Sequence, residues 1–181
     1  YNEEDPVPDA KRRYILAHER KHQIDGLELI KADMSLSEAY NIACHYEIAA
    51  TQAGLFQAIY DLENTNTKEE AYEIINNIPD FSEYLESIYK GEHSIFKCEN
   101  AEQLEQELGH CVNLVIDKWS NKYSDTYDES HLSLVEFYFG GKNYSELKPN
   151  PEAYQKELSK IYTMGGVDFS KYIKNDIKCF S

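Results

Sequence analysis

A His-Glu-x-x-His pattern near the start of the chain, His18-Glu19-Arg20-Lys21-His22, constrains this sequence more than any other feature. It lies in an apolar, uninterrupted stretch that predicts a helix. Residues four apart lie on the same side of a helix, so His18 and His22 can bind one divalent metal ion together. Neutral imidazoles suit zinc, and Glu19 starts about 100° further round the helix, near enough to reach a water on that ion. The alternative is a polar helix face with two incidental histidines.

A candidate third ligand, Glu47, follows on the next predicted helix. Ser35-Leu36-Ser37-Glu38 is a capping-box pattern and predicts a helix from there to about Leu62. One side of this helix carries small and apolar residues, with Glu47 as its only charge. Burying a carboxylate is costly unless it is paired or bound to a metal. Glu47 is therefore predicted to be a ligand, and the alternative is an ion pair with a basic side chain such as Arg13.

His45 lies on the other side of the same predicted helix. It shares that side with Ile48, Gln52, Phe56 and Ile59. A histidine among such neighbours is predicted to be a hydrogen-bonded core residue and not a metal ligand.

Hydrophobic periodicity along the chain predicts helices and no strand with an evident partner. The predicted helices cover about 10–31, 36–62, 68–78, 81–90, 101–121, 131–139 and 151–164, and one more short helix follows residue 167. We therefore expect an all-α fold, with a single domain of about seven helices over residues 1–181. The first helix is apolar on two sides, so it and the following helix are expected at the centre of this domain. The sequence is also compatible with the C-terminal part of a longer chain.

The composition excludes some classes of partner. The formal net charge of −15 repels the phosphates of nucleic acids and the surface of anionic membranes. No run of eighteen apolar residues exists, so no membrane span is predicted. Nothing in the composition sets the oligomeric state.

Four cysteines, Cys44, Cys98, Cys111 and Cys179, are scattered along the chain without a Cys-x-x-Cys pair. This spacing fits neither a zinc ribbon nor a dense disulfide framework. We expect thiols in a reducing compartment, and therefore a cytoplasmic location. Because the chain does not begin with Met, a secreted protein that has lost an N-terminal signal is the alternative.

The stretch Ile15-Leu16-Ala17-His18-Glu19-Arg20-Lys21-His22 resembles the active-site helix of the zincin superfamily of zinc metallopeptidases. Tyr46-Glu47-Ile48-Ala49-Ala50 resembles the helix that supplies a glutamate in the gluzincins. The part of the chain that contains both stretches is also similar to small bacterial metallopeptidase domains. The resemblance implies one Zn²⁺ per chain, bound by His18, His22 and Glu47, with a water in the fourth position. Glu19 would act as general base, and the substrate would be a peptide or protein.

The sequence departs from the zincin pattern in two ways. Zincins place a β-sheet before the motif helix, whereas only 17 residues precede His18 and none of them reads as a strand. The metzincin variant expects a glycine and a further ligand where this chain has Asp25 and Glu28, which leaves Glu28 as an alternative third ligand. The oxyanion-stabilising residue cannot be chosen among 15 tyrosines, His93, His110 and His131.

Two competing functions follow from these departures. One is a non-catalytic helical protein-interaction domain with a structural or vestigial metal site. The other is a metal-dependent hydrolase of a non-peptide bond, which would use the same ligands.

Overall fold

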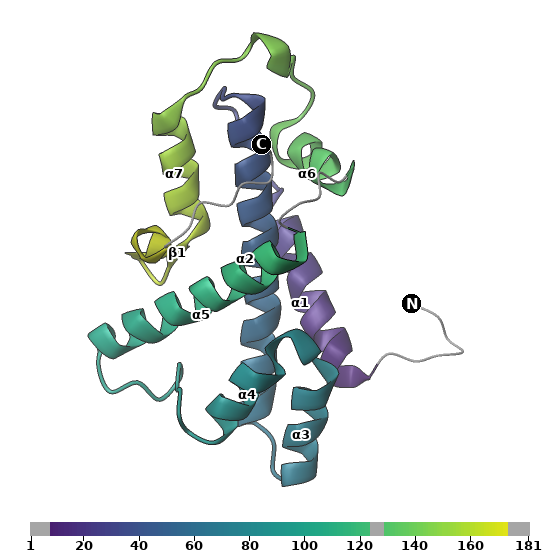
Figure 1. Cartoon of the computed structure of the whole chain (residues 1–181), viewed down its shortest axis with the longest axis vertical. Coiled ribbons are helices and arrows are strands. Elements are labelled where there is room, and N and C mark those ends of the chain that lie inside the picture. The colour runs from purple at the N-terminus through teal and green to yellow at the C-terminus, as the bar shows by residue number, and fades with distance from the viewer. Residues whose placement is uncertain (1–7, 124–128, 174–181) are drawn as a thin grey trace. The chain divides into compact units, whose positions relative to one another are not determined.

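The computed structural model describes residues 8–123 and 129–173. Within these residues the chain forms seven α-helices and one two-stranded sheet, which confirms the predicted all-α fold (Figure 1). The α-helices are α1 (Asp9–Asp25), α2 (Leu36–Glu63), α3 (Lys68–Asn77), α4 (Ser82–Tyr89), α5 (Ala101–Tyr123), α6 (Glu129–Phe139) and α7 (Pro151–Ile161). The short elements are the 3-10 helices η1 (Pro79–Phe81), η2 (Tyr144–Glu146) and η3 (Phe169–Tyr172) and the strands β1 (Thr163–Met164) and β2 (Val167–Asp168).

Capping side chains begin α2 and α7 where the sequence predicts. The backbone N–H of Glu38 donates to Ser35 Oγ over 3.3 Å, and the N–H of Ser35 donates to Glu38 Oε1 over 2.9 Å. Asn150 Oδ1 accepts from the N–H of Ala153 at the start of α7. These bonds satisfy first-turn N–H groups that lack an intrahelical partner. Glu38 Oε1 also accepts from the N–H of Asn150 over 2.8 Å, so one carboxylate serves both helix starts.

The chain divides into two compact units, which we describe separately. Unit 1 comprises Tyr1–Lys21 and Ala50–Leu108, and unit 2 comprises His22–Ala49 and Gly109–Ser181. The boundaries fall inside α1, α2 and α5, so each unit includes part of these continuous helices. The single domain over residues 1–181 stays a prediction.

In unit 1, α3 and α4 contact each other (Figure 1). The Arg13 guanidinium of α1 makes two hydrogen bonds of 2.9 Å with the Asp61 carboxylate of α2. A Cβ atom on Gly54 would lie 3.0 Å from the backbone oxygen of Tyr14, so the glycine permits close approach of these helices. The core consists of apolar side chains from α2, α3 and α4, among them Leu55, Ile59, Ala71, Ile75 and Leu85.

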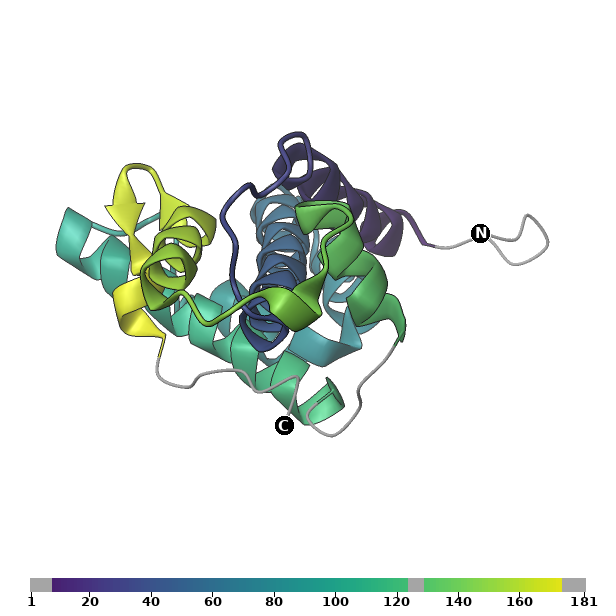
Figure 2. The ribbon, with the colours of Figure 1, turned by 90° about the horizontal axis from the view of Figure 1, so that it is seen from above.

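In unit 2, a hairpin follows α7, and η3 contacts both α7 and β1 (Figure 2). Thr163 pairs with Asp168, and the turn consists of Gly165 and Gly166, with φ of 58° and 82°. Two positive φ values in a two-residue turn favour glycine. The prediction of a helix to Met164 without strands is wrong here, because this glycine pair forms the hairpin turn and is not a helix stop.

The helix α1 is shorter than predicted, since it ends at Asp25 and not near Lys31. Gly26 follows its last residue, and a Cβ atom on Gly26 would overlap the ring of Phe137 on α6. Close approach of the chain to an aromatic ring therefore explains this glycine.

The helix α1 is also less buried than expected. His22 is its one buried residue among those described, while Leu16 and Ile24 expose 57% and 54% of their surface. In contrast, α2 is buried along most of its length. The core is therefore built on the second helix, which differs from the expectation that both helices lie at the centre.

The other predictions about elements have mixed outcomes. No strand forms in residues 92–99, and α5 extends to Tyr123. Residues 124–128 and 174–181 lie outside the described residues, so the C-terminal end of the last predicted segment is not tested. None of the described helices has the length and apolar character that crossing a membrane requires.

The cysteines differ in state. Cys44, on the buried part of α2, is disulfide-bonded, whereas Cys98 and Cys111 are thiols. Cys179 lies outside the described residues. The expectation of thiols is therefore wrong for Cys44, because the spacing of cysteines in sequence does not reveal which of them meet in space.

Candidate metal centre

The structure brings His18, His22 and Glu47 together, as the sequence predicts. Each residue offers one ligand atom, and these three atoms all lie within 4.8 Å of one another. His22 is buried, and the other two side chains are half-buried. Because His18 and His22 are one turn apart on the continuous helix α1, their relative position follows from helix geometry.

Within unit 2, the side chain of His22 contacts that of Glu47. The Nε2 atom of His22 lies 2.7 Å from Oε2 of Glu47. Arg13, which was considered as an alternative partner of Glu47, bonds the Asp61 carboxylate. Glu47, the single charge among small residues on one side of α2, is therefore in contact with His22 of the His-Glu-x-x-His motif.

A buried tyrosine holds the ring of His22. The Oη atom of Tyr138, on α6, lies 2.8 Å from Nδ1 of His22. Tyr138 is fully buried, and its ring stacks on Tyr46 with centroids 4.2 Å apart. A hydrogen bond at Nδ1 fixes the orientation of a metal-binding imidazole and directs its Nε2 toward the ion. No sequence signal distinguishes Tyr138 among the 15 tyrosines of the chain.

His18 has a comparable neighbour in unit 1. Its Nδ1 atom lies 3.4 Å from Oγ1 of Thr51, which is one turn after Glu47 on α2. A hydrogen bond at Nδ1 makes Nε2 the nitrogen that would bind a metal.

The two other carboxylates of the hypothesis lie at the surface. Glu19 is exposed on α1 beside His18, which leaves its carboxylate accessible to water. Glu28 is exposed beyond the end of α1 and is not part of the three-residue group. The geometry therefore favours Glu47 over Glu28 as third ligand.

His45 is a core residue, as expected. Its Nδ1 atom lies 2.8 Å from Oη of Tyr162, and the two rings meet edge to face. Burial lowers the pKa of His45 to about 4, so the ring is neutral at pH 7. Burial also raises the pKa of Tyr162, which keeps its hydroxyl group protonated.

His93 and His110, two of the histidines considered for oxyanion stabilisation, are not in the three-residue group. His93 lies 3.3 Å from a carboxylate oxygen of Glu107 in unit 1. His110 is exposed on α5, and the side chain of His131 lies outside the described ones.

In comparisons with known proteins, no family model, no curated protein and no solved structure matches this chain.

Proposed function

We propose that this protein is a zinc-dependent metallopeptidase. The observation that supports the proposal most directly is the group of His18, His22 and Glu47, whose ligand atoms lie within 4.8 Å of one another. Two imidazoles and a carboxylate form the donor set of many catalytic zinc sites, and three protein ligands leave a fourth position for water. The hydrogen bond between Nδ1 of His22 and Oη of Tyr138 adds the support that such ligands usually have.

In the proposed reaction the residues of this chain have distinct roles. Zinc held by His18, His22 and Glu47 would lower the pKa of a water ligand and polarise the peptide carbonyl. Glu19 would take a proton from this water as its oxygen bonds to the carbonyl carbon, and would give the proton to the leaving amine as the C–N bond breaks. Its exposure on α1 suits this exchange.

A second function, a helical protein-interaction domain, is favoured by the exposed apolar side chains of the motif helix. Leu16 and Ile24 on α1 are more than half exposed, and Leu27 beyond its end is 81% exposed. Exposed apolar side chains that gather on one element often mark interaction sites. In this function the metal site would be structural.

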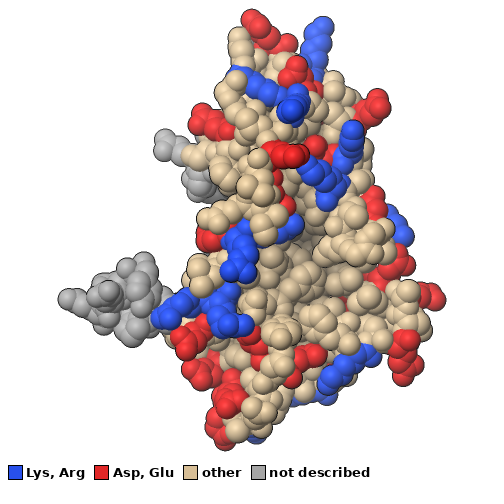
Figure 3. Space-filling view, turned by 180° about the vertical axis from the view of Figure 1, so that it is seen from behind, with Lys and Arg blue, Asp and Glu red and all other residues tan. Residues whose placement is uncertain are grey.

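The charge distribution supports a peptide or protein partner. Figure 3 shows Lys and Arg side chains interspersed with Asp and Glu, without one basic patch on that face. Together with the net charge of −15, this disfavours nucleic acid. A cytoplasmic location stays a prediction, and the Cys44 disulfide favours the secreted alternative, since disulfides persist in oxidising compartments.

Metal analysis of the purified protein after equilibration with zinc tests the proposal first. We expect about one zinc per chain, lost in His18→Ala and retained in His110→Ala, a variant of an exposed histidine outside the group. Less than about 0.1 zinc per chain would contradict every metal-dependent function.

The variant Glu19→Gln then separates catalysis from binding. We expect it to keep zinc and to lose hydrolysis of a mixed peptide library. Unchanged hydrolysis would remove Glu19 from the mechanism. Zinc binding by the unmodified protein without hydrolysis of any peptide would favour the interaction domain.

A further inference from the structure

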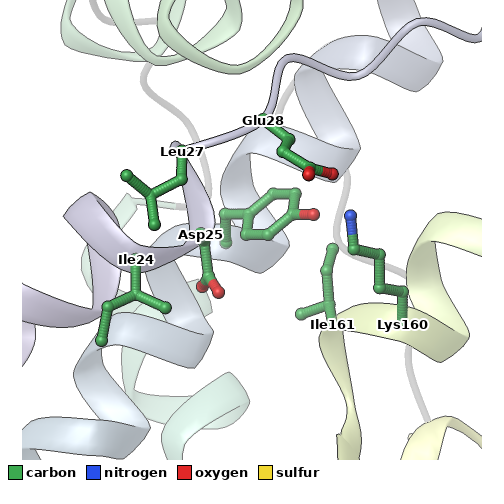
Figure 4. Close-up of a pocket in the computed structure, with 7 residues that line it drawn as sticks. Ile24, Asp25, Leu27, Glu28, Lys160 and Ile161 are labelled. Carbon is green, nitrogen blue, oxygen red and sulfur yellow. The ribbon is translucent and has the colours of Figure 1, made fainter.

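A pocket of about 280 Å³ lies in unit 2 (Figure 4). The end of α1 and the loop after it form one side, and α2 and α7 form the rest. The lining residues are Ile24, Asp25, Leu27, Glu28, Tyr46, Lys160 and Ile161.

The walls of this pocket are largely apolar. Ile24 and Leu27 line it while remaining exposed, and Ile161 is buried. The ring of Tyr46 is held in place, because it is buried, stacks on Tyr138 and donates its hydroxyl to Glu157 Oε2 over 3.1 Å. Three aliphatic side chains and an aromatic ring form a surface that suits a chain of methylene groups.

The charges in the pocket favour a cation. Two carboxylates, Asp25 and Glu28, line it against one ammonium group, Lys160. Figure 4 shows the Glu28 carboxylate and the Lys160 ammonium pointing toward one another across the pocket. The lining therefore carries a net charge of −1, and an anionic ligand would meet two carboxylates.

We propose that this pocket binds the side chain of a lysine or arginine residue of a peptide. The methylene stem lies against Ile24, Leu27 and Ile161. The cationic head pairs with Asp25 and Glu28. Such a side chain has an apolar stem and a charged head. The apolar residues of the lining suit the stem, and its carboxylates suit the head.

The pocket shares two helices with His22 and Glu47 in unit 2. Asp25 is three residues after His22 on α1 and therefore its neighbour on the helix surface, and Tyr46 directly precedes Glu47 on α2. If the proposed function holds, the pocket selects peptides with a basic residue near the cleaved bond. The inference rests on the proposed function only in calling that peptide a substrate, because binding to the pocket requires no metal.

The test measures binding of short fluorescent alanine-based peptides, blocked at both ends, to the whole chain kept metal-free with EDTA. The peptides differ at one central position, which is Arg, Lys, norleucine or Glu. We expect the Arg and Lys peptides to bind about 5-fold or more tightly than the norleucine peptide, and the Glu peptide most weakly.

Variants with matched controls locate the binding. We expect Asp25→Asn and Glu28→Gln each to weaken binding of the Arg peptide about 2- to 5-fold, and Lys160→Met to strengthen it. Glu152→Gln and Lys156→Met, exposed on α7 and outside the lining, should leave it unchanged. Glu28 and Lys160 are exposed, so these two variants keep the test decisive even where Asp25→Asn disturbs the fold.

Each outcome bears on the inference in one direction. Equal binding of the Arg and norleucine peptides, or no binding at millimolar peptide, overturns it. Tighter binding of the Glu peptide, weakened by Lys160→Met, would assign the pocket to an anionic ligand and also overturns it. Binding of the Arg peptide without hydrolysis in the presence of zinc would sink the proposed peptidase function and leave the inference standing.

Discussion

The Nε2 atom of His22 lies 2.7 Å from the Oε2 atom of Glu47, on the neighbouring helix α2. The Glu47 side chain is one quarter exposed, so its charge is partly removed from water. A half-buried carboxylate next to an imidazole is stabilised by a hydrogen bond, by a shared cation, or by each in turn. Whether His18 and His22 form part of a three-ligand metal site therefore depends on Glu47.

Glu47→Gln should weaken zinc binding by about 10-fold or more, because a neutral amide replaces an anionic ligand of similar shape. Competition with a chromogenic zinc chelator measures the change. The matched control is Glu63→Gln, at the far end of α2 and outside the three-residue group. Unaltered affinity would remove Glu47 from the site and return Glu28 to consideration.

Tyr138→Phe should weaken zinc binding by roughly 10- to 100-fold, because it removes the hydrogen bond that orients the His22 ring. The phenylalanine ring keeps the stacking on Tyr46. Tyr162→Phe is the matched control, since it removes an equally short bond to a histidine outside the metal group, His45. Equal zinc affinity of the Tyr138→Phe variant and the unmodified protein would contradict an orienting role.

Much of the secondary structure could be predicted because helix starts and repeated apolar positions are local signals. The capping box at Ser35 and the Asn150-Pro151 pair begin helices where expected. Glu47 could be found for a similar reason, as a single charge in a stripe of small residues. The role of His45 followed from its apolar neighbours.

Features that depend on distant parts of the chain could not be predicted. The bond from Tyr138 to His22 joins residues 116 positions apart, and no local pattern indicates it. The apolar residues of α1 show which side chains could be buried, but they do not show which other parts of the chain cover them. The exposure of Leu16 was therefore not predicted. The Cys44 disulfide likewise depends on which residues meet in space.

Stability should fall as the pH is lowered from about 6.5 toward 4, because His45 is buried in its neutral form. Burial lowers the pKa of His45 from 6.5 to about 4, so in this interval the unfolded chain binds a proton that the folded protein does not. The contribution is fully present above pH 6.5 and amounts to about 3 kcal/mol when it is completely lost near pH 4. Urea unfolding at several pH values measures the slope.

The comparison that isolates His45 is with His45→Gln. Glutamine does not bind the proton and can still bond to Tyr162 Oη. The unmodified protein should lose about 3 kcal/mol more than this variant between pH 6.5 and 4. Parallel stability curves for the two proteins would contradict the lowered pKa.

Gly26→Ala should reduce the free energy of unfolding by about 1–3 kcal/mol, because the new Cβ atom overlaps the Phe137 ring and forces a shift. Phe137 precedes Tyr138, so the same shift should also weaken zinc binding through His22. Gly141→Ala is the control, since a Cβ atom there meets nothing within 4 Å. If the overlap is the cause, adding Phe137→Ala to Gly26→Ala should restore zinc affinity. Urea unfolding and zinc titration of the single and the double variant measure the effect. Zinc affinity that stays low in the double variant would indicate a backbone effect at residue 26 instead of the overlap.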